Sequence, residues 1–294
     1  MSRSRFGKGD VTGQVVVVTG GARGVGKELA RELTTRGARV ALLGLEPAEL
    51  AAVAAELPGS RAYDVDVTDG AALTAAAAAV VADFGRVDVV VANAGIASAG
   101  PLLLADPGSY EKCIEVNLLG SIRTVRAFLP ALVQSKGYVL QIASLAAMTH
   151  APFMSAYCAS KAGAEAFAHS LQGELRHHGV RVGVGYLAFT DTDMVRGVDA
   201  RPGLSSMRQG LAGPFGRTYP LAPAVVRLAD GIGRRSSHVY AQKWVRGVAG
   251  VRGLLPTVIP LGARGLEQAE AEIVAAGAAE VTRPVGAGGA ANRV

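Results

Sequence analysis

The strongest constraint on the fold is an unbroken aliphatic run, Val15–Thr19, that leads into a glycine-rich turn. The run reads VVVVT without polar alternation, which is typical of a strand buried on both faces of a parallel sheet. The turn reads TGGARGVG, and the residues after it have helical spacing up to residue 36. Because glycines let a backbone approach a pyrophosphate at a helix N-terminus, this order indicates a dinucleotide-binding unit.

Strands and helices continue to alternate over most of the chain. Further strands are expected at residues 39–43, 61–65, 87–92, 137–143, 180–186 and 239–241. Helices are expected between them at residues 47–57, 70–84, 109–133, 155–178 and 222–235. We therefore predict one α/β domain over residues 11–241, a Rossmann-type doubly wound parallel sheet in three α/β/α layers.

The ends of the chain and one internal segment interrupt this pattern. We expect residues 1–10 to be flexible, and residues 191–219 to be irregular and mobile because they contain prolines and several glycines. Residues 242–277 are expected to form a C-terminal helical extension near the substrate entrance. Residues 278–294 are expected to be a disordered tail.

Composition excludes several classes of protein. Half of the residues are apolar and 18% are charged, which excludes a chain that is disordered throughout. The two cysteines, Cys113 and Cys158, cannot make a disulfide scaffold, and the sequence suggests no metal site. We see no run of about 18 apolar residues that could span a bilayer, and no signal peptide. The expected location is the cytoplasm.

Positive charge is concentrated in the last third of the chain. Between residues 194 and 266 there are eleven Lys or Arg against two Asp, so this segment carries +9 while the remainder is net negative. Such asymmetry is compatible with an anionic partner or with a solvated basic face. Peripheral contact with a membrane stays open, whereas nucleic acid is not expected, since base recognition needs aromatic or motif context that is missing.

Residues with chemical potential follow the expected strands in a fixed order. They are Asp66 and Val67, the turn Asn93-Ala94-Gly95, Asn117, Ser144, Tyr157 and Lys161. Tyr157 and Lys161 are four residues apart in YCASK, so they share one helix face. Ser144 precedes them by a loop long enough to bring its hydroxyl beside them.

Over residues 11–241 the chain resembles the short-chain dehydrogenase/reductase (SDR) family. The glycine turn has that family's TGxxxGxG spacing, and the other motifs stand in the family's order. The resemblance implies an oxidoreductase that transfers hydride between a nicotinamide cofactor and a ketone or aldehyde, or the matching alcohol. It also implies a homodimer or homotetramer, and a catalytic tetrad of Asn117, Ser144, Tyr157 and Lys161.

The expected chemistry rests on the phenol of Tyr157. Its ordinary pKa is about 10, and the Lys161 ammonium, with the positive nicotinamide, is expected to favour the phenolate. Tyr157 would then exchange a proton with the substrate oxygen while Ser144 holds that oxygen by a hydrogen bond. By resemblance, Lys161 also contacts the nicotinamide ribose, and Asn117 anchors a water.

The resemblance also implies the residues that contact the cofactor. They are Thr19, Gly20, Ala22, Arg23, Gly24, Val25, Gly26, Gly44, Asp66, Val67, Asn93, Ala94, Gly95, Tyr157, Lys161 and Thr192. Asp66 is expected at the adenine ring and Thr192 at the nicotinamide carboxamide. One departure lies just before Thr192, where Leu187 and Ala188 replace the family's Pro-Gly.

Cofactor choice depends on the residues after the second strand. NAD-dependent proteins of this fold commonly place an Asp there to bind the ribose, but this chain has Gly44. Arg23 could meet a 2′-phosphate, so we predict NADP(H). Glu46 could bind the ribose instead, which leaves NAD(H) as the alternative.

Two other interpretations were considered. A nicotinamide-binding sensor without turnover would not need both Tyr157 and Lys161. A peripheral membrane-associated scaffold would use the basic segment. We also predict a bulky apolar substrate, because the extension holds Trp244 and several aliphatic residues that need burial.

Overall fold

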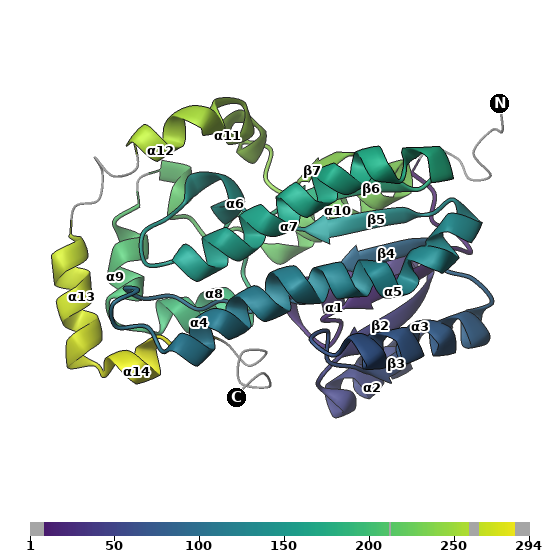
Figure 1. Cartoon of the computed structure of the whole chain (residues 1–294), viewed down its shortest axis with the longest axis horizontal. Coiled ribbons are helices and arrows are strands. Elements are labelled where there is room, and N and C mark those ends of the chain that lie inside the picture. Colours follow the sequence, from purple (N-terminus) through teal and green to yellow (C-terminus); the bar gives the residue numbers. More distant parts are fainter. Residues whose placement is uncertain (1–8, 212, 259–264, 286–294) are drawn as a thin grey trace.

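Seven parallel strands form the centre of the structure (Figure 1). The computed structural model describes residues 9–211, 213–258 and 265–285. In chain order the strands are β1 (Val15–Thr19), β2 (Arg39–Gly44), β3 (Arg61–Asp64), β4 (Val89–Ala92), β5 (Tyr138–Ile142), β6 (Arg181–Tyr186) and β7 (His238–Tyr240). Their order across the sheet, β3-β2-β1-β4-β5-β6-β7, is that of a doubly wound sheet. The predicted fold class is confirmed.

Helices cover both faces of the sheet. The main ones are α1 (Gly24–Thr35), α2 (Pro47–Glu56), α3 (Gly70–Phe84), α4 (Pro107–Ile114), α5 (Gly120–Ser135), α7 (Ser155–Glu174) and α10 (Leu221–Arg234). Side chains alternate along β1, so Val16 and Val18 face α1, α2 and α10, whereas Val15 and Val17 face α3, α5 and α7. Both sets of valines are fully buried, which explains why the strand has no polar position.

Asn117 lies in a π-helical turn, η1 (Glu115–Leu119), between α4 and α5. The continuous helix Pro107–Ser135 is the one helix of the described residues that is long and apolar enough to cross a membrane, and 44% of its most apolar window is buried. The expectation that no segment of the chain is long and apolar enough to span a bilayer is therefore wrong. The helix packs against α3 and α7 and buries Asn117, Ser121 and Thr124, as a core helix does.

The segment after β6 is more regular than expected. Residues 191–219 contain α8 (Asp193–Asp199), α9 (Leu204–Gln209) and the short turn η3 (Gly213–Phe215). Arg208 holds α9 to the end of α8, with its Nη2 donating to Asp199 Oδ2 at 2.5 Å. The Tyr219 N–H donates to the Phe189 carbonyl at 2.8 Å and closes the segment at its base. The expectation of an irregular stretch is therefore wrong for α8 and α9.

Several short helices follow β7. They are α11 (Val245–Val251), η4 (Arg252–Leu254), α12 (Leu255–Val258) and α13 (Leu266–Ala275). Val245 and Val248 of α11 join the core, and Trp244 packs edge-on against Phe215 with ring centroids 5.2 Å apart. Ile273 of α13 instead joins the apolar cluster around Tyr157. In the extension, α13 is thus the helix that reaches the Tyr157 side of the molecule.

The expectation of a disordered tail from residue 278 is wrong for its first part. Residues 278–281 form α14 (Ala278–Val281), and Thr282 and Val285 are buried. Apolar contacts and backbone hydrogen bonds, such as that from the Val285 N–H to the Ala97 carbonyl at 2.9 Å, fix this segment. The rest of the predicted tail, and residues 1–8 of the predicted flexible N-terminus, lie outside the described residues.

A buried carboxylate attaches the extension to α7. Glu165 is 2% exposed, and its carboxylate accepts from Arg252 Nη1 and Nη2 at 2.6 and 2.8 Å, and from the Tyr186 hydroxyl at 2.5 Å. Burial alone would raise the pKa of Glu165, but the hydrogen bonds from Arg252 and Tyr186 outweigh it and hold that pKa below 4.5.

We expect Arg252→Ala to lower the free energy of unfolding by about 2 kcal/mol, a usual value for hydrogen bonds to a charged group. Because the pKa of Glu165 is depressed, its contribution is present above the unfolded pKa and is lost as the pH falls. The difference between wild type and variant should therefore shrink in acid. Denaturant unfolding at neutral and acidic pH measures it, with exposed Arg246→Ala on α11 as the matched control. Equal effects of the two substitutions would contradict this account.

Candidate active site

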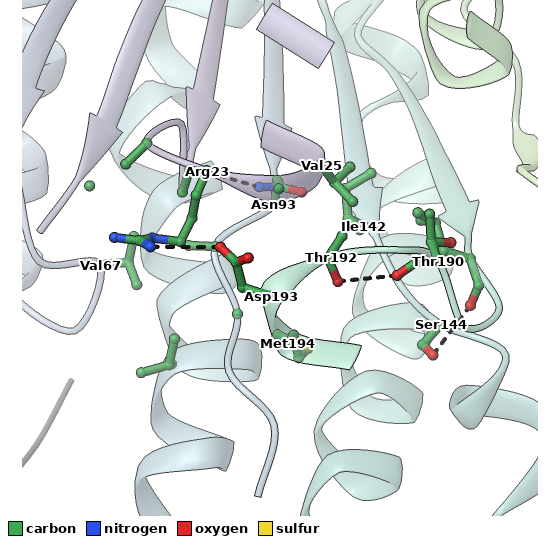
Figure 2. A pocket seen from close by; sticks show the side chains of 18 of the residues that line it. Arg23, Val25, Val67, Asn93, Ile142, Ser144, Thr190, Thr192, Asp193 and Met194 are labelled. Carbon is green, nitrogen blue, oxygen red and sulfur yellow. Dashed lines mark hydrogen bonds and ion pairs between the residues drawn. The ribbon is translucent and has the colours of Figure 1, made fainter. Parts of the chain in front are cut away.

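A cleft with a volume of about 220 Å³ lies at the carboxyl ends of the central strands (Figure 2). Fourteen of the residues singled out in the sequence line it: Gly20, Ala22, Arg23, Gly24, Val25, Gly44, Asp66, Val67, Asn93, Ala94, Gly95, Tyr157, Lys161 and Thr192. Ser144 lines it as well. Motifs separated by more than a hundred residues therefore meet in one cleft, because parallel strands present their carboxyl ends at the same edge.

The glycine turn between β1 and α1 is packed too closely for side chains at two positions. A Cβ on Gly26 would lie 2.1 Å from the Gly20 carbonyl oxygen. A Cβ on Gly20 would lie 3.0 Å from the Ala94 Cα, and Gly20 has a φ of +66°. The turn leads into the N-terminus of α1 and lines the cleft, and a helix N-terminus suits an anionic group.

Thr19 and Gly26 support the cleft from behind and do not line it. The Thr19 hydroxyl accepts from the N–H groups of Asn93 and Ala94, both at 3.0 Å. The Asn93 side chain donates in return to the Thr19 carbonyl at 2.8 Å. These bonds fix the turn after β4 against the glycine turn, so Thr19 is placed as a positioning residue.

Arg23 lies at one end of the cleft between two carboxylates. Its Nε donates to Glu46 Oε2 at 3.0 Å, and its Nη2 also pairs with Glu46. Its Nη1 lies 3.7 Å from Asp193 Oδ2 (Figure 2). The hydrogen bond that Arg23 donates to Glu46 is the main reason why the pKa of Arg23 is raised. The guanidinium therefore stays charged beside Gly44, where β2 ends.

Ser144, Tyr157 and Lys161 lie at the other end of the cleft. The Ser144 hydroxyl donates to the Leu187 carbonyl at 3.4 Å (Figure 2), and it lies near enough to the Tyr157 phenol to act on its pKa. The Lys161 ammonium donates to the Ile142 carbonyl at 3.1 Å and lies 5.8 Å from the centre of the Tyr157 ring. Since α7 carries both Tyr157 and Lys161, its start at Ser155 sets their positions.

Burial sets the ionisation of Tyr157 and Lys161 in this structure. It raises the pKa of the Tyr157 phenol to about 12, although the nearby Ser144 hydroxyl acts to lower it. Burial also lowers the pKa of Lys161 to about 8. At neutral pH the phenol therefore keeps its proton. The shift toward the phenolate, which depends on Lys161 together with the bound nicotinamide, stays a prediction.

Asn117 does not line the cleft. It is fully buried, and its side chain accepts from the Ile96 N–H at 2.8 Å and donates to the Ile96 carbonyl at 2.9 Å. It also donates to the Ser160 hydroxyl at 3.0 Å. The π-helical turn aims this amide at the loop after β4, so the structure places Asn117 as a residue that fixes the loop beside Gly95.

Hydrogen bonds hold the turn after β6, where Leu187 and Ala188 stand in place of the expected Pro-Gly. The Leu187 carbonyl accepts from the Leu145 N–H at 2.8 Å, and the Ala188 N–H donates to Gln242 Oε1 at 2.9 Å. Beyond this turn the Thr192 hydroxyl donates to the Thr190 carbonyl at 3.2 Å (Figure 2). Thr192 Cγ2 would lie 3.6 Å from a Cβ on Gly24, so Thr192 lies next to the glycine turn.

Sequence reasoning missed four lining residues that bear on function: Asp193, Met194 and Val285 entirely, and Glu46 as a partner of Arg23. Asp193 directly follows Thr192, a predicted cofactor contact, so its place next to that residue could have indicated the cleft. No motif in the sequence pointed to Val285. Among the described residues, no group of three or more His, Cys, Asp or Glu is placed to hold a metal ion.

The fold and the cleft define a nucleotide-binding α/β protein with a Ser, a Tyr and a Lys at one end of its site. The chain belongs to the short-chain dehydrogenase family, whose family model, described as short chain dehydrogenase, matches residues 14–203.

Relatives and a solved structure agree with this assignment. The chain is 35% identical to the dehydrogenase/reductase SDR family member 7B of Bos taurus over 60% of this chain, and it spans only 59% of that protein's length. It is 32% identical to the 3-oxoacyl-(acyl-carrier-protein) reductase FabG of Escherichia coli over 74% of this chain and 90% of that protein. The crystal structure of gox2181 has a TM-score of 0.73 at 26% identity, covering 80% of this chain and 96% of that one.

Proposed function

We propose that the protein is an NADP(H)-dependent oxidoreductase that interconverts a ketone or aldehyde and the matching alcohol. The observation that carries this proposal is the meeting of the glycine turn with Ser144, Tyr157 and Lys161 in one cleft. Dehydrogenases and reductases among the relatives support the reaction class.

The residues present fit a nicotinamide dinucleotide. Gly20 and Gly26 leave no room for side chains under the turn, and Arg23 offers a charged group for a phosphate. Asp66 lines the cleft beside Gly44 as a candidate for the adenine ring, and Thr192 lines it next to Gly24. When bound, the cofactor supplies or accepts the hydride. The chain's own groups then have to bind the substrate oxygen and move one proton.

In the reductive direction, Tyr157 donates the proton. Its raised pKa keeps the phenol protonated at neutral pH, so it is ready to act as an acid toward the carbonyl oxygen. Ser144, whose hydroxyl lies near that phenol, donates to the same oxygen as negative charge develops on it. The Lys161 ammonium then stabilises the phenolate left behind, and the alcohol leaves with the proton of Tyr157.

Arg23 should decide between the two cofactors. A 2′-phosphate bound to Arg23 has to compete with the Glu46 carboxylate that now pairs with it. We expect Arg23→Ala to weaken NADPH binding about 10- to 100-fold, the value of a charged hydrogen bond, with little effect on NADH. Glu46→Gln should instead tighten NADPH binding. Titration of each variant with both cofactors measures this.

Tighter binding of NADH than of NADPH by the wild-type protein would contradict the cofactor assignment. In that case Glu46 would be the group that meets the ribose. Glu49, an acidic residue in the first turn of α2, is the control: Glu49→Gln makes the same change of charge near Arg23 without removing its hydrogen-bond partner.

The reaction itself is tested by following NADPH consumption with ketones and aldehydes of graded size. The apolar residues Leu187, Ala188 and Met194, which line the same cleft as Ser144, favour an apolar substrate. Cofactor binding without turnover of any carbonyl or alcohol would support the nicotinamide-binding sensor instead.

The cytoplasmic location, the homodimer or homotetramer and the peripheral membrane contact stay predictions. Several arginines of the basic segment have internal partners: Arg208 pairs with Asp199, Arg252 with Glu165, and Arg201 with backbone carbonyls. These partners favour a structural role for much of the positive charge in this segment.

A further inference from the structure

The last described residues, 282–285, lie across the Tyr157 side of the molecule, and we call them the C-terminal strap. Thr282 and Val285 are buried, with exposed fractions of 0% and 1%. The strap hydrogen-bonds to the loop that follows β4. The Val285 N–H donates to the Ala97 carbonyl at 2.9 Å, and the Ser98 hydroxyl donates to the Thr282 carbonyl at 2.9 Å.

Arg201 fixes the strap from the opposite side. Its guanidinium donates to the Val281 carbonyl at 2.7 Å and to the Pro284 carbonyl at 3.2 Å, and it also contacts the Arg283 carbonyl. One side chain between α8 and α9 thus holds the backbone on both sides of residue 283. The strap is therefore fixed at both of its edges.

The loop after β4 is shaped to receive the strap. A Cβ on Gly100 would lie 2.5 Å from Thr282 Cγ2, and the φ of Gly100 is +144°. The Thr282 hydroxyl also accepts from the Asp106 N–H at 3.2 Å. This close fit shows that the strap is part of the folded unit.

Val285 is the residue through which the strap enters the cleft. Among the described residues it is the only lining residue beyond Val195. It belongs to an apolar cluster with Ala97, Met154 and Cys158, against which the Tyr157 side chain packs. Val285 therefore lines the same cleft as Tyr157 and belongs to the apolar cluster against which the Tyr157 side chain packs.

We propose that Val285 is a specificity-determining residue, which limits the size of the apolar group next to the reactive carbonyl carbon. This inference rests on the proposed function. The wall contributed by the strap is aliphatic, so it selects by shape and not by charge. The expected substrate is a carbonyl compound with a compact apolar substituent. This expectation differs from the bulky apolar substrate predicted from the sequence.

The test compares acetone, cyclohexanone and acetophenone as substrates of wild type and Val285→Ala. Removing two methyl groups from the wall should raise kcat/KM for acetophenone relative to acetone at least about 10-fold, since a single methylene in an apolar pocket changes discrimination by that much or more. Val285→Phe should shift the ratio in the opposite direction.

Val281→Ala is the matched control. Val281 is 4% exposed in the same cluster but does not line the cleft, so its loss should reduce stability and leave the ratio of ketones unchanged. An unchanged ratio in both Val285 variants, or an equal shift in Val281→Ala, would overturn the proposal.

Binding of the same ketones, measured by calorimetry in the presence of NADP, separates this proposal from the proposed function. If no ketone turns over, the proposed function fails, yet Val285→Ala should still bind acetophenone more tightly relative to cyclohexanone than wild type does. Failure to see that change would overturn the role of Val285 independently.

Discussion

Replacing Tyr157 by phenylalanine is expected to lower kcat about 10²- to 10⁴-fold, the range for loss of a general acid. The phenolic hydroxyl is the only group removed, and the half-buried ring packs against an apolar cluster, so the phenyl ring should keep its place. The glycine turn and Arg23 stay intact, so the dissociation constant of NADPH should change little. Steady-state kinetics and a fluorescence titration with NADPH measure the two effects.

Tyr110→Phe is the matched control for this substitution. Tyr110 lies on α4, where its hydroxyl hydrogen-bonds with Ser155 Oγ at 3.4 Å outside the cleft. Its loss should leave kcat near the wild-type value. Near wild-type turnover by Tyr157→Phe, or a loss of equal size in both variants, would contradict the assigned acid.

Lys161→Met is expected to lower activity while raising stability. The Lys161 ammonium is 4% exposed, and the Ile142 carbonyl is the acceptor that the structure gives it. Turnover should fall about 10- to 100-fold with the loss of a charged hydrogen-bond donor. The free energy of unfolding of the cofactor-free protein should rise by about 2 kcal/mol at pH 7, because a buried charge is replaced by an apolar side chain of similar length.

The pH dependence gives a second test of Lys161. Its folded pKa of about 8 lies below the ordinary value of 10.5. The unfolded chain therefore binds the proton more tightly, and the wild-type free energy of unfolding should rise with pH between these two values relative to the variant. The advantage of Lys161→Met should shrink over this range. A variant less stable than wild type at pH 7 would contradict the cost assigned to the buried ammonium.

Most of the sheet could be predicted because its central strands β1 and β4 are continuous runs of buried aliphatic residues and the other strands hold shorter ones. Val15–Thr19 is confirmed at the same bounds, since buried parallel strands leave a continuous apolar signal. Strand ends were less certain: β4 begins at Val89, two residues later than predicted. The carboxylate of Asp88, just before β4, accepts from the Val15 N–H at 3.0 Å. A side-chain contact of this kind at the start of a strand is not visible in the hydrophobic periodicity of the sequence.

The cleft could be predicted from short motifs, but its electrostatics could not. The sequence places Tyr157 and Lys161 on one helix face, yet the direction of each pKa shift depends on burial by residues far away in the chain. Arg23 was expected to be open for a phosphate, and the structure pairs it with Glu46. That pair depends on how α2 begins after β2, which spacing alone does not fix.

The C-terminal contribution to the cleft could not be predicted from local patterns. Residues 278–285 contain one short helix and two buried valines, with no periodic signal. Their position in the structure is fixed by contacts with residues distant in the sequence, chiefly Arg201, Ser98 and Gly100. Short segments fixed by tertiary contacts do not show in composition, which explains why a disordered tail was expected.

The most direct test of the account follows the hydride itself. Wild-type protein is mixed in a single turnover with a small ketone and NADPH that carries deuterium at the transferable position of the nicotinamide ring. We predict that deuterium appears on the carbinol carbon of the product, and that Tyr157→Phe binds the labelled cofactor without forming that product. Binding of the cofactor by the wild-type protein without transfer of deuterium to any carbonyl compound tested would contradict the account.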